Sequence, residues 1–169
     1  MIGPPPHRRV CLWWGDHLGI DMTRIRLLAA VAAFAMPVAA LAAGPVLMHR
    51  DPGCPCCEKW AQQVKAQFGR AVRVVDDANR PAFMKARGVP ADLASCHTAI
   101  IDGITFEGHV PIADMKRALA THPKGVTGLA VAGMPMGSPG MEMPGMKAQP
   151  YDVVAFGPSG RRVFAHHGG

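Results

Sequence analysis

Between residues 46 and 75, apolar positions form two short runs separated by a stretch with helical spacing. The runs, at 46–48 and 71–75, predict strands. The apolar residues between them recur along one face of a helix: Cys57, Trp60, Ala61, Val64 and Phe68. This spacing predicts an amphipathic helix. Gly69 is expected to end it, because glycine readily adopts the left-handed conformation that follows many helices.

The next pattern predicts a second helix, a hairpin and a third helix. Pro81 suits the first turn of the second helix, where an amide hydrogen is not needed, and Gly88 ends it. The Asp-Gly pair at 102–103 has apolar residues on both sides, which strongly favours a two-residue hairpin turn. The third helix is indicated by three apolar residues at helical spacing: Ile112, Met115 and Leu119.

The predicted order is strand, helix, strand, helix, hairpin, helix. Two parallel strands joined by a helix and followed by an antiparallel hairpin form a mixed sheet flanked by helices. This is the order of a thioredoxin-like domain, so we predict an α/β fold of that type for residues 43–123. A generic α+β sandwich of the same elements is the alternative.

The composition changes after Pro123. Residues 133–146 carry five methionines among many glycines and prolines, which favours an extended loop over helix or strand. Apolar segments at 152–156 and 161–165 flank a Gly-Pro-Ser-Gly turn and predict a second hairpin. Residues 124–169 lack enough apolar residues for a core of their own, so we interpret them as a C-terminal extension.

The beginning of the chain has the pattern of a secretory signal. Residues 22–26 are basic, 27–38 are apolar, and Ala40-Leu41-Ala42 has the small-residue spacing of a cleavage site. The apolar run is shorter than the roughly 20 residues of a membrane span. We therefore expect residues 22–42 to be a cleaved signal peptide, with no stable membrane insertion afterwards; an uncleaved anchor is the alternative. Residues 1–21 precede this pattern and are expected to be a mis-assigned start.

Charge excludes one class of function. The formal net charge is +6, but Lys and Arg are scattered in runs of no more than two, and there is a single Tyr. A nucleic-acid surface gathers its positive charge on one stripe and adds aromatic residues. The charges therefore indicate an ordinary solvated surface and no nucleic-acid partner.

Cysteines provide the main candidate chemistry. Three of the five lie at 54–57, in Cys-Pro-Cys-Cys, whereas Cys11 precedes the expected mature chain. A disulfide framework spreads its cysteines, so this crowding favours a metal site or a redox site. A helix N-terminus stabilises thiolates, which suits both kinds of site.

Cys96 adds a fourth sulfur. In a thioredoxin-like domain the start of the hairpin faces the cysteine motif and normally carries a cis-proline; here that position holds Ser95-Cys96-His97. We therefore expect Cys96 to face the other three cysteines, the alternative being a buried inert thiol. Four thiolates from two segments favour a metal site, and the methionines at 133–146 favour Cu(I) over zinc, since thioether and thiolate ligands together select Cu(I). A flexible linker is the alternative interpretation of the methionines.

Histidines are weaker candidates. His97 adjoins Cys96, His109 follows the hairpin, and His49 precedes the cysteine turn. A single His is more often a satisfied polar residue than a ligand. His166 and His167 are expected on a mobile tail with adventitious metal binding.

A set of motifs runs in order through the expected mature chain: Cys54-Pro55-Cys56-Cys57 with Trp60, Gly88-Val89-Pro90, Ser95-Cys96-His97-Thr98-Ala99, Glu107-Gly108-His109-Val110-Pro111, Gly128-Leu129-Ala130-Val131, Gly133-Met134-Pro135 and Gly137-Ser138-Pro139-Gly140-Met141-Glu142. With these motifs the sequence resembles the CopG-type copper-resistance family over nearly the whole expected mature chain.

The resemblance implies a periplasmic thioredoxin-like protein whose C-terminal extension helps to bind a cysteine-bridged cluster of more than one copper ion. It also implies a role in interconverting Cu(I) and Cu(II) and in aiding an efflux system. We expect a monomer. A thiol-disulfide oxidoreductase and a passive copper chaperone stay open as alternatives, so enzymatic activity is undecided, with copper oxidoreductase as the candidate. The expected metal ligands are Cys54, Cys56, Cys57, Cys96, Met134, Met141 and His97.

Overall fold

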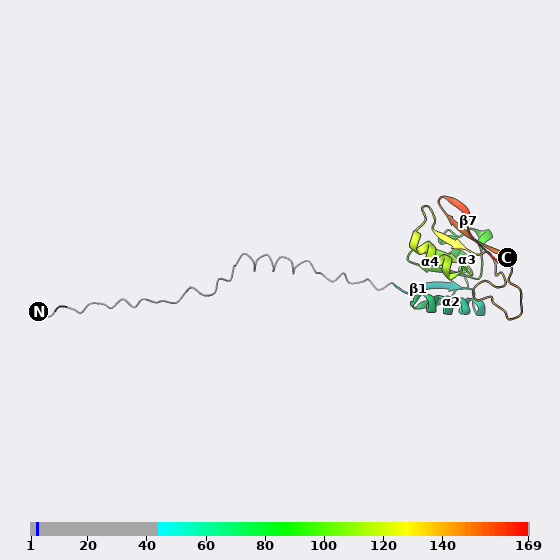
Figure 1. The fold of residues 1–169 in the computed structure, drawn as a ribbon, viewed down its shortest axis with the longest axis horizontal. Coiled ribbons are helices and arrows are strands. Elements are labelled where there is room, and N and C mark those ends of the chain that lie inside the picture. The colour runs from blue at the N-terminus through cyan, green and yellow to red at the C-terminus, as the bar shows by residue number, and fades with distance from the viewer. Residues whose placement is uncertain (1–2, 4–43, 169) are drawn as a thin grey trace, which may run out of the picture. The chain divides into compact units, whose positions relative to one another are not determined.

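Seven strands form one mixed sheet in the structure, which is a computed structural model (Figure 1). The structure describes Gly3 and residues 44–168. Apart from Gly3, the segments predicted at 1–21 and 22–42 lie outside the described residues. All the helices and strands below belong to one compact unit of the chain.

The elements follow the predicted order, including the second hairpin, with the short 3-10 helix and strand β5 added. In chain order they are β1 Val46–Arg50, α2 Pro55–Phe68, β2 Val72–Asp76, α3 Arg80–Ala86, the 3-10 helix η1 Ala91–Leu93, β3 His97–Ile101, β4 Ile104–Glu107, α4 Ile112–Thr121, β5 Gly128–Ala130, β6 Tyr151–Gly157 and β7 Gly160–His167. Among these described elements, no helix is long and apolar enough to cross a membrane.

The strand order across the sheet is β2-β1-β3-β4-β5-β6-β7. β1 is parallel to β2 and antiparallel to β3, and β3 forms an antiparallel hairpin with β4. The predicted mixed α/β fold is therefore confirmed, and this pairing agrees with the thioredoxin-like arrangement. The register of β1 on β3 places Arg50 opposite His97, so the end of β1 lies beside the start of β3.

Local sequence explains how the elements begin and end. Cys54 is the N-cap of α2, and Gly69 ends the helix with φ of 62°. At the hairpin, Asp102 and Gly103 both have positive φ, as a type I′ turn requires. The helix therefore starts at the cysteine motif, where the Cys54 side chain accepts from the backbone amide of Cys57.

Two apolar clusters cover the two faces of the sheet. The larger contains Trp60 of α2 and Met115 of α4, and the smaller contains Met84 of α3. Adjacent residues of β5 alternate between them, Leu129 in the larger cluster and Ala130 in the smaller. This alternation is expected for a strand covered on both faces.

The C-terminal extension continues the sheet. β5 pairs in parallel with β4, and β6 and β7 form the predicted second hairpin against β5. The expectation that His166 and His167 lie on a mobile tail is wrong, because both belong to β7. His167 Nε2 lies 2.6 Å from Asp114 Oδ2, and its ring stacks on Tyr151.

Candidate metal centre

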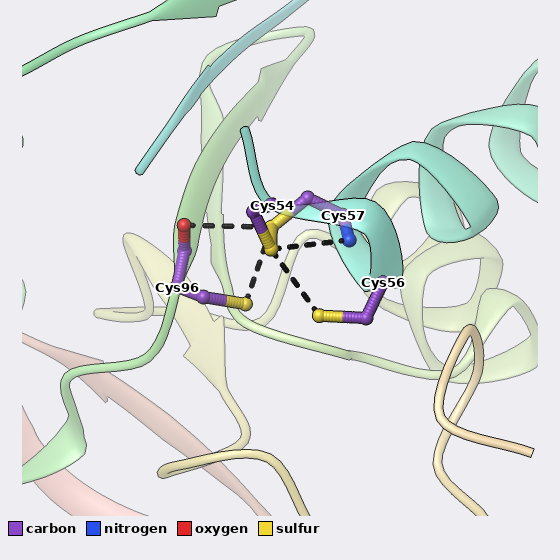
Figure 2. Close-up of side chains that lie close together, drawn as sticks. All are labelled: Cys54, Cys56, Cys57 and Cys96. Atoms are coloured by element: carbon purple, nitrogen blue, oxygen red, sulfur yellow. Dashed lines mark hydrogen bonds between the residues drawn. A yellow bond between two sulfur atoms is a disulfide. The ribbon is translucent and has the colours of Figure 1, made fainter. Parts of the chain in front are cut away.

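Four cysteines gather at the N-terminus of α2 (Figure 2). Cys54, Cys56 and Cys57 come from the start of the helix, and Cys96 from the residue before β3. Cys54 Sγ lies 3.2 Å from Cys56 Sγ, and Cys57 Sγ lies 3.3 Å from Cys96 Sγ. All four sulfurs lie within 4.8 Å of one another, so this four-cysteine cluster could hold metal.

Backbone contacts hold the two cysteine segments together. The turn at 51–53 leads into the cluster, and Asp51 N donates a hydrogen bond of 3.0 Å to Cys96 O. Cys57 N donates a 3.4 Å hydrogen bond to Cys54 Sγ, as expected when the Cys54 side chain caps helix α2. The sheet thus brings Cys96 to the helix terminus, which is where the sequence analysis expected it.

Within the cluster, Cys54 and Cys57 form a disulfide, whereas Cys56 and Cys96 are free thiols. Thiolate is the form of cysteine that binds metal. Because of its Cys54–Cys57 disulfide, the structure represents an oxidised state. Reduction of this disulfide makes all four sulfurs available to a metal.

The methionine-rich segment 133–146, here called the methionine loop, passes beside the cluster. Met134 Sδ lies 3.9 Å from Cys56 Sγ, and the side chain of Met134 is half exposed. Gly140 packs so closely that an added Cβ would lie 2.7 Å from Cys56 O. Gln63 of α2 donates a 3.0 Å hydrogen bond to Glu142, which also fixes the loop. Met141 is half-buried between these contacts.

Two buried histidines adjoin Cys96, and sequence reasoning left one of them undecided. His109 Nε2 lies 3.1 Å from Cys96 Sγ, and His97 Nδ1 lies 3.6 Å from it. His109 Nδ1 donates to Pro139 O at 2.8 Å, which leaves a lone pair on Nε2 directed at the sulfur. This is the arrangement in which a second hydrogen bond orients a metal-binding histidine. Cys96, His97 and His109 thus form a second group able to hold a metal.

Comparison with known proteins decides the family. A family model described as "Protein of unknown function, DUF411" matches residues 93–141. The solved structure "Copper resistance protein copG- Form 1" is 40% identical, covers 75% of this chain and 99% of its own, and superposes with a TM-score of 0.68. Form 2 is also 40% identical, covers 73% and 97%, and has a TM-score of 0.67.

The chain belongs to the CopG family of copper resistance proteins. The resemblance drawn from the sequence motifs is thereby confirmed. A search of curated proteins gives no match. The residues of this chain that the DUF411 family model matches, 93–141, include Cys96, both buried histidines and most of the methionine loop, but not the cysteines of α2.

Burial sets the protonation of this CopG-family site. Burial, with a smaller contribution from the charge of Cys56, raises the pKa of the Cys96 thiol to about 12. Burial also lowers the pKa of His97 and of His109 below the usual range. In the metal-free protein near pH 7 Cys96 is therefore a thiol and both imidazoles are neutral. A metal that binds Cys96 must displace its proton, whereas the imidazoles already present lone pairs.

The other candidate histidines have structural partners elsewhere. His49 Nδ1 lies 2.8 Å from Asp77 Oδ2, and its ring stacks on Phe83. His166 Nδ1 lies 2.6 Å from Asp152 Oδ1 across the β6–β7 hairpin. Neither residue belongs to the two metal-capable groups of the described chain.

Proposed function

We propose that this CopG-family protein binds copper in the course of copper resistance, and that the four-cysteine cluster holds more than one Cu(I) ion through bridging thiolates. The observation that carries the proposal is the convergence of four sulfurs within 4.8 Å. Three of these sulfurs come from four consecutive residues, which crowds a single tetrahedral ion but suits adjacent ions that share ligands.

The surrounding donors favour the same metal. Met134 brings a thioether to Cys56, and Met141 lies half-buried in the same loop. Thioether sulfur selects Cu(I) in preference to zinc. We propose that Met134, Met141 and His97 complete the cysteine ligands, and we add His109 because its Nε2 lone pair faces Cys96.

A mixed donor set supports chemistry in both copper oxidation states. Thiolates and thioethers favour Cu(I), whereas imidazole nitrogen also suits Cu(II). We propose that the protein interconverts Cu(I) and Cu(II). Each ion oxidised gives up one electron, which a separate redox partner must accept, and the reverse step needs a donor. The oxidation state in which copper leaves the site then determines what an efflux system can take up.

One observation favours a second function, that of a thiol-disulfide oxidoreductase. Cys54 and Cys57 form a disulfide at a helix N-terminus, the position at which thioredoxin-type enzymes hold their redox pair. Cys56 argues against it, because a free thiol 3.2 Å from Cys54 invites the wrong disulfide. A passive copper chaperone needs the same ligands and differs only in lacking an electron-transfer step.

Metal analysis after anaerobic purification distinguishes a copper-binding protein from a thiol-disulfide oxidoreductase. The reduced protein is loaded with Cu(I), freed of excess metal, and assayed for copper per chain and for reduction of insulin disulfides. The proposal predicts more than one copper per chain and little insulin reduction. A metal-free protein that reduces insulin efficiently contradicts it. Oxidation of the loaded protein, followed by absorbance and electron paramagnetic resonance, distinguishes a redox site from a chaperone.

We also propose that the protein works in the periplasm after removal of residues 22–42. The family and the sequence pattern support this, with Ala43 as the expected first residue of the mature chain. Mass spectrometry of the exported protein tests the proposal, and a mature protein that retains residues before Met22 contradicts it.

A further inference from the structure

A buried ion pair lies behind the metal-capable groups, and the proposed copper chemistry does not use it. The side chain of Arg80, from the start of α3, is 7% exposed, and that of Glu107, at the end of β4, is fully buried. Charged residues are rarely buried to this degree unless they are paired. Arg80 Nη1 donates to Glu107 Oε1 at 3.1 Å.

Glu107 fixes the segment that carries Cys96. Its Oε1 accepts a 2.8 Å hydrogen bond from the backbone amide of Ser95, the residue before Cys96. Its Oε2 accepts a 2.5 Å hydrogen bond from the hydroxyl of Thr98, two residues after Cys96. The carboxylate therefore holds the chain on both sides of this cysteine.

Arg80 joins that segment to the other half of the cluster. Its Nε donates to Asp51 Oδ1 at 2.6 Å, and its Nη2 donates to the carbonyl oxygen of Ser95. Asp51 opens the turn that leads to Cys54. One guanidinium group thus connects the segment before Cys54, the segment before Cys96 and the buried carboxylate. Its planar fork of donors makes this possible, whereas a lysine ammonium has no such geometry.

We propose that Arg80, paired with Glu107, is a positioning residue that sets the separation between Cys96 and the cysteines of α2. This inference rests on the proposed copper function for its purpose, although the positioning itself can be measured without copper. Replacing a buried ion pair by apolar groups often leaves stability unchanged or raises it. A pair whose contacts converge on the two cysteine segments is better explained by the geometry that it imposes on them.

The test variant is R80M/E107Q in the full chain. Changing both residues avoids leaving one buried charge unpaired, which is strongly destabilising. Glutamine can still accept from Ser95 N, so the main loss is the bridge that Arg80 makes to Asp51 and to the Ser95 carbonyl. The matched control is R70M/D102N, which removes the two-bond ion pair of Arg70 with Asp102 at the opposite end of β1.

The first measurement uses metal-free protein. In a C11S/C54S/C56S background, Cys57 and Cys96 are the cysteines that stay, and the equilibrium constant for their disulfide is measured in a glutathione redox buffer. We expect R80M/E107Q to lower this constant by about tenfold or more, because small displacements of reacting groups have large effects. The control R70M/D102N should match the unaltered background.

The second measurement is the retention of Cu(I) against a competing chelator, with all cysteines present and below the unfolding temperature of each variant. We expect weaker retention in R80M/E107Q and unchanged retention in R70M/D102N. R80K keeps a positive charge beside Glu107, so we expect it to fold even if the double variant does not. We expect R80K to lower the disulfide constant too, since lysine cannot make the three-way bridge.

The outcomes separate this inference from the proposed function. A disulfide constant that is unchanged in R80M/E107Q, or fully restored in R80K, overturns the positioning role. The Arg80–Glu107 pair would then contribute only to fold stability or through its charge. A fall in that constant, together with a wild-type protein that takes up no copper, upholds the positioning role and refutes the copper function.

Discussion

The sulfur atoms of Cys57 and Cys96 lie 3.3 Å apart, although 39 positions separate the two residues in the chain. Cys57 is in the first turn of α2, and Cys96 immediately precedes β3. The antiparallel pairing of β1 with β3 brings the two segments together at one end of the sheet. The candidate metal centre therefore depends on the tertiary fold and does not exist in the cysteine motif alone.

This relationship predicts that Cys96→Ser weakens copper binding about as much as Cys56→Ser does. Each change removes one soft ligand from the same cluster, and we expect retention of Cu(I) against a chelator to fall at least about tenfold in both. M143I/M146I, which removes two exposed sulfurs outside the four-cysteine cluster, is the control and should behave as wild type. If Cys96→Ser keeps the copper content and affinity of wild type, Cys96 is an inert buried thiol.

Two pairs of methionines in the methionine loop can be compared to test whether its thioethers bind copper. Replacing Met134 and Met141 with Ile roughly keeps their bulk, and we expect selective loss of Cu(I) retention because the thioether donors are gone. Met143 and Met146 are exposed residues of the same loop, so M143I/M146I is the matched control. A chelator titration under reducing conditions compares the two double variants. Identical curves would mean that the loop is a linker.

Gly140 tests whether the loop must pack closely on the cluster. An added Cβ would lie 2.7 Å from Cys56 O and 3.0 Å from Trp60 N, so G140A should push the loop outward and weaken Cu(I) retention. Gly145 also has a positive φ but open space around it, so G145A carries the same backbone strain without the clash. We expect G145A to retain copper as wild type does. Equal effects of the two variants would show that backbone strain alone is responsible.

Burial of His97 predicts a pH dependence of stability in the reduced, metal-free protein. Burial, aided by the nearby charges of His109 and Arg80, lowers the pKa of His97 well below about 6.5, the value expected in the unfolded chain. As the pH falls below that value, the unfolded chain binds a proton that the folded protein does not. Stability is then lost at up to about 1.4 kcal/mol per pH unit, until the pH reaches the folded pKa.

This prediction is tested by measuring the urea concentration at the midpoint of unfolding of the metal-free protein at about pH 7.5 and about pH 5.5. His97→Phe keeps an aromatic ring against Trp60 and removes the titrating group beside Cys96, so its midpoint should fall less on acidification. His109 also has a pKa lowered by burial, so part of the slope persists in this variant. An unchanged slope in His97→Phe would show that His97 does not contribute.

The sequence predicted most of the fold because its signals are local. Helical spacing before Phe68 and the Asp102-Gly103 turn depend on neighbouring residues, and both gave the correct elements. β5 was missed, since three residues that pair with β4 and β6 carry no periodicity of their own. The ordering of His167 was missed as well, because its partner Asp114 lies 53 positions away on α4.

The same distinction between local and long-range signals applies to the candidate site. The cysteine motif and the facing position of Cys96 follow from motif spacing and fold order. The direction of His109 depends on the carbonyl of Pro139, 30 positions further along the chain, and no local pattern encodes it. The bridge from Arg80 to Asp51 and Ser95 likewise joins three separate segments, so it emerges only when the chain is folded.

X-ray absorption at the copper edge tests the central claim most directly. The reduced wild-type protein is loaded anaerobically with Cu(I), and its spectrum is compared with that of Cys96→Ser at the same copper-to-protein ratio. A cysteine-bridged cluster predicts a first shell dominated by sulfur, a short copper–copper distance, and loss or weakening of that distance in the variant. A single copper with no copper–copper scattering, or a first shell of nitrogen and oxygen in the wild type, would contradict the account.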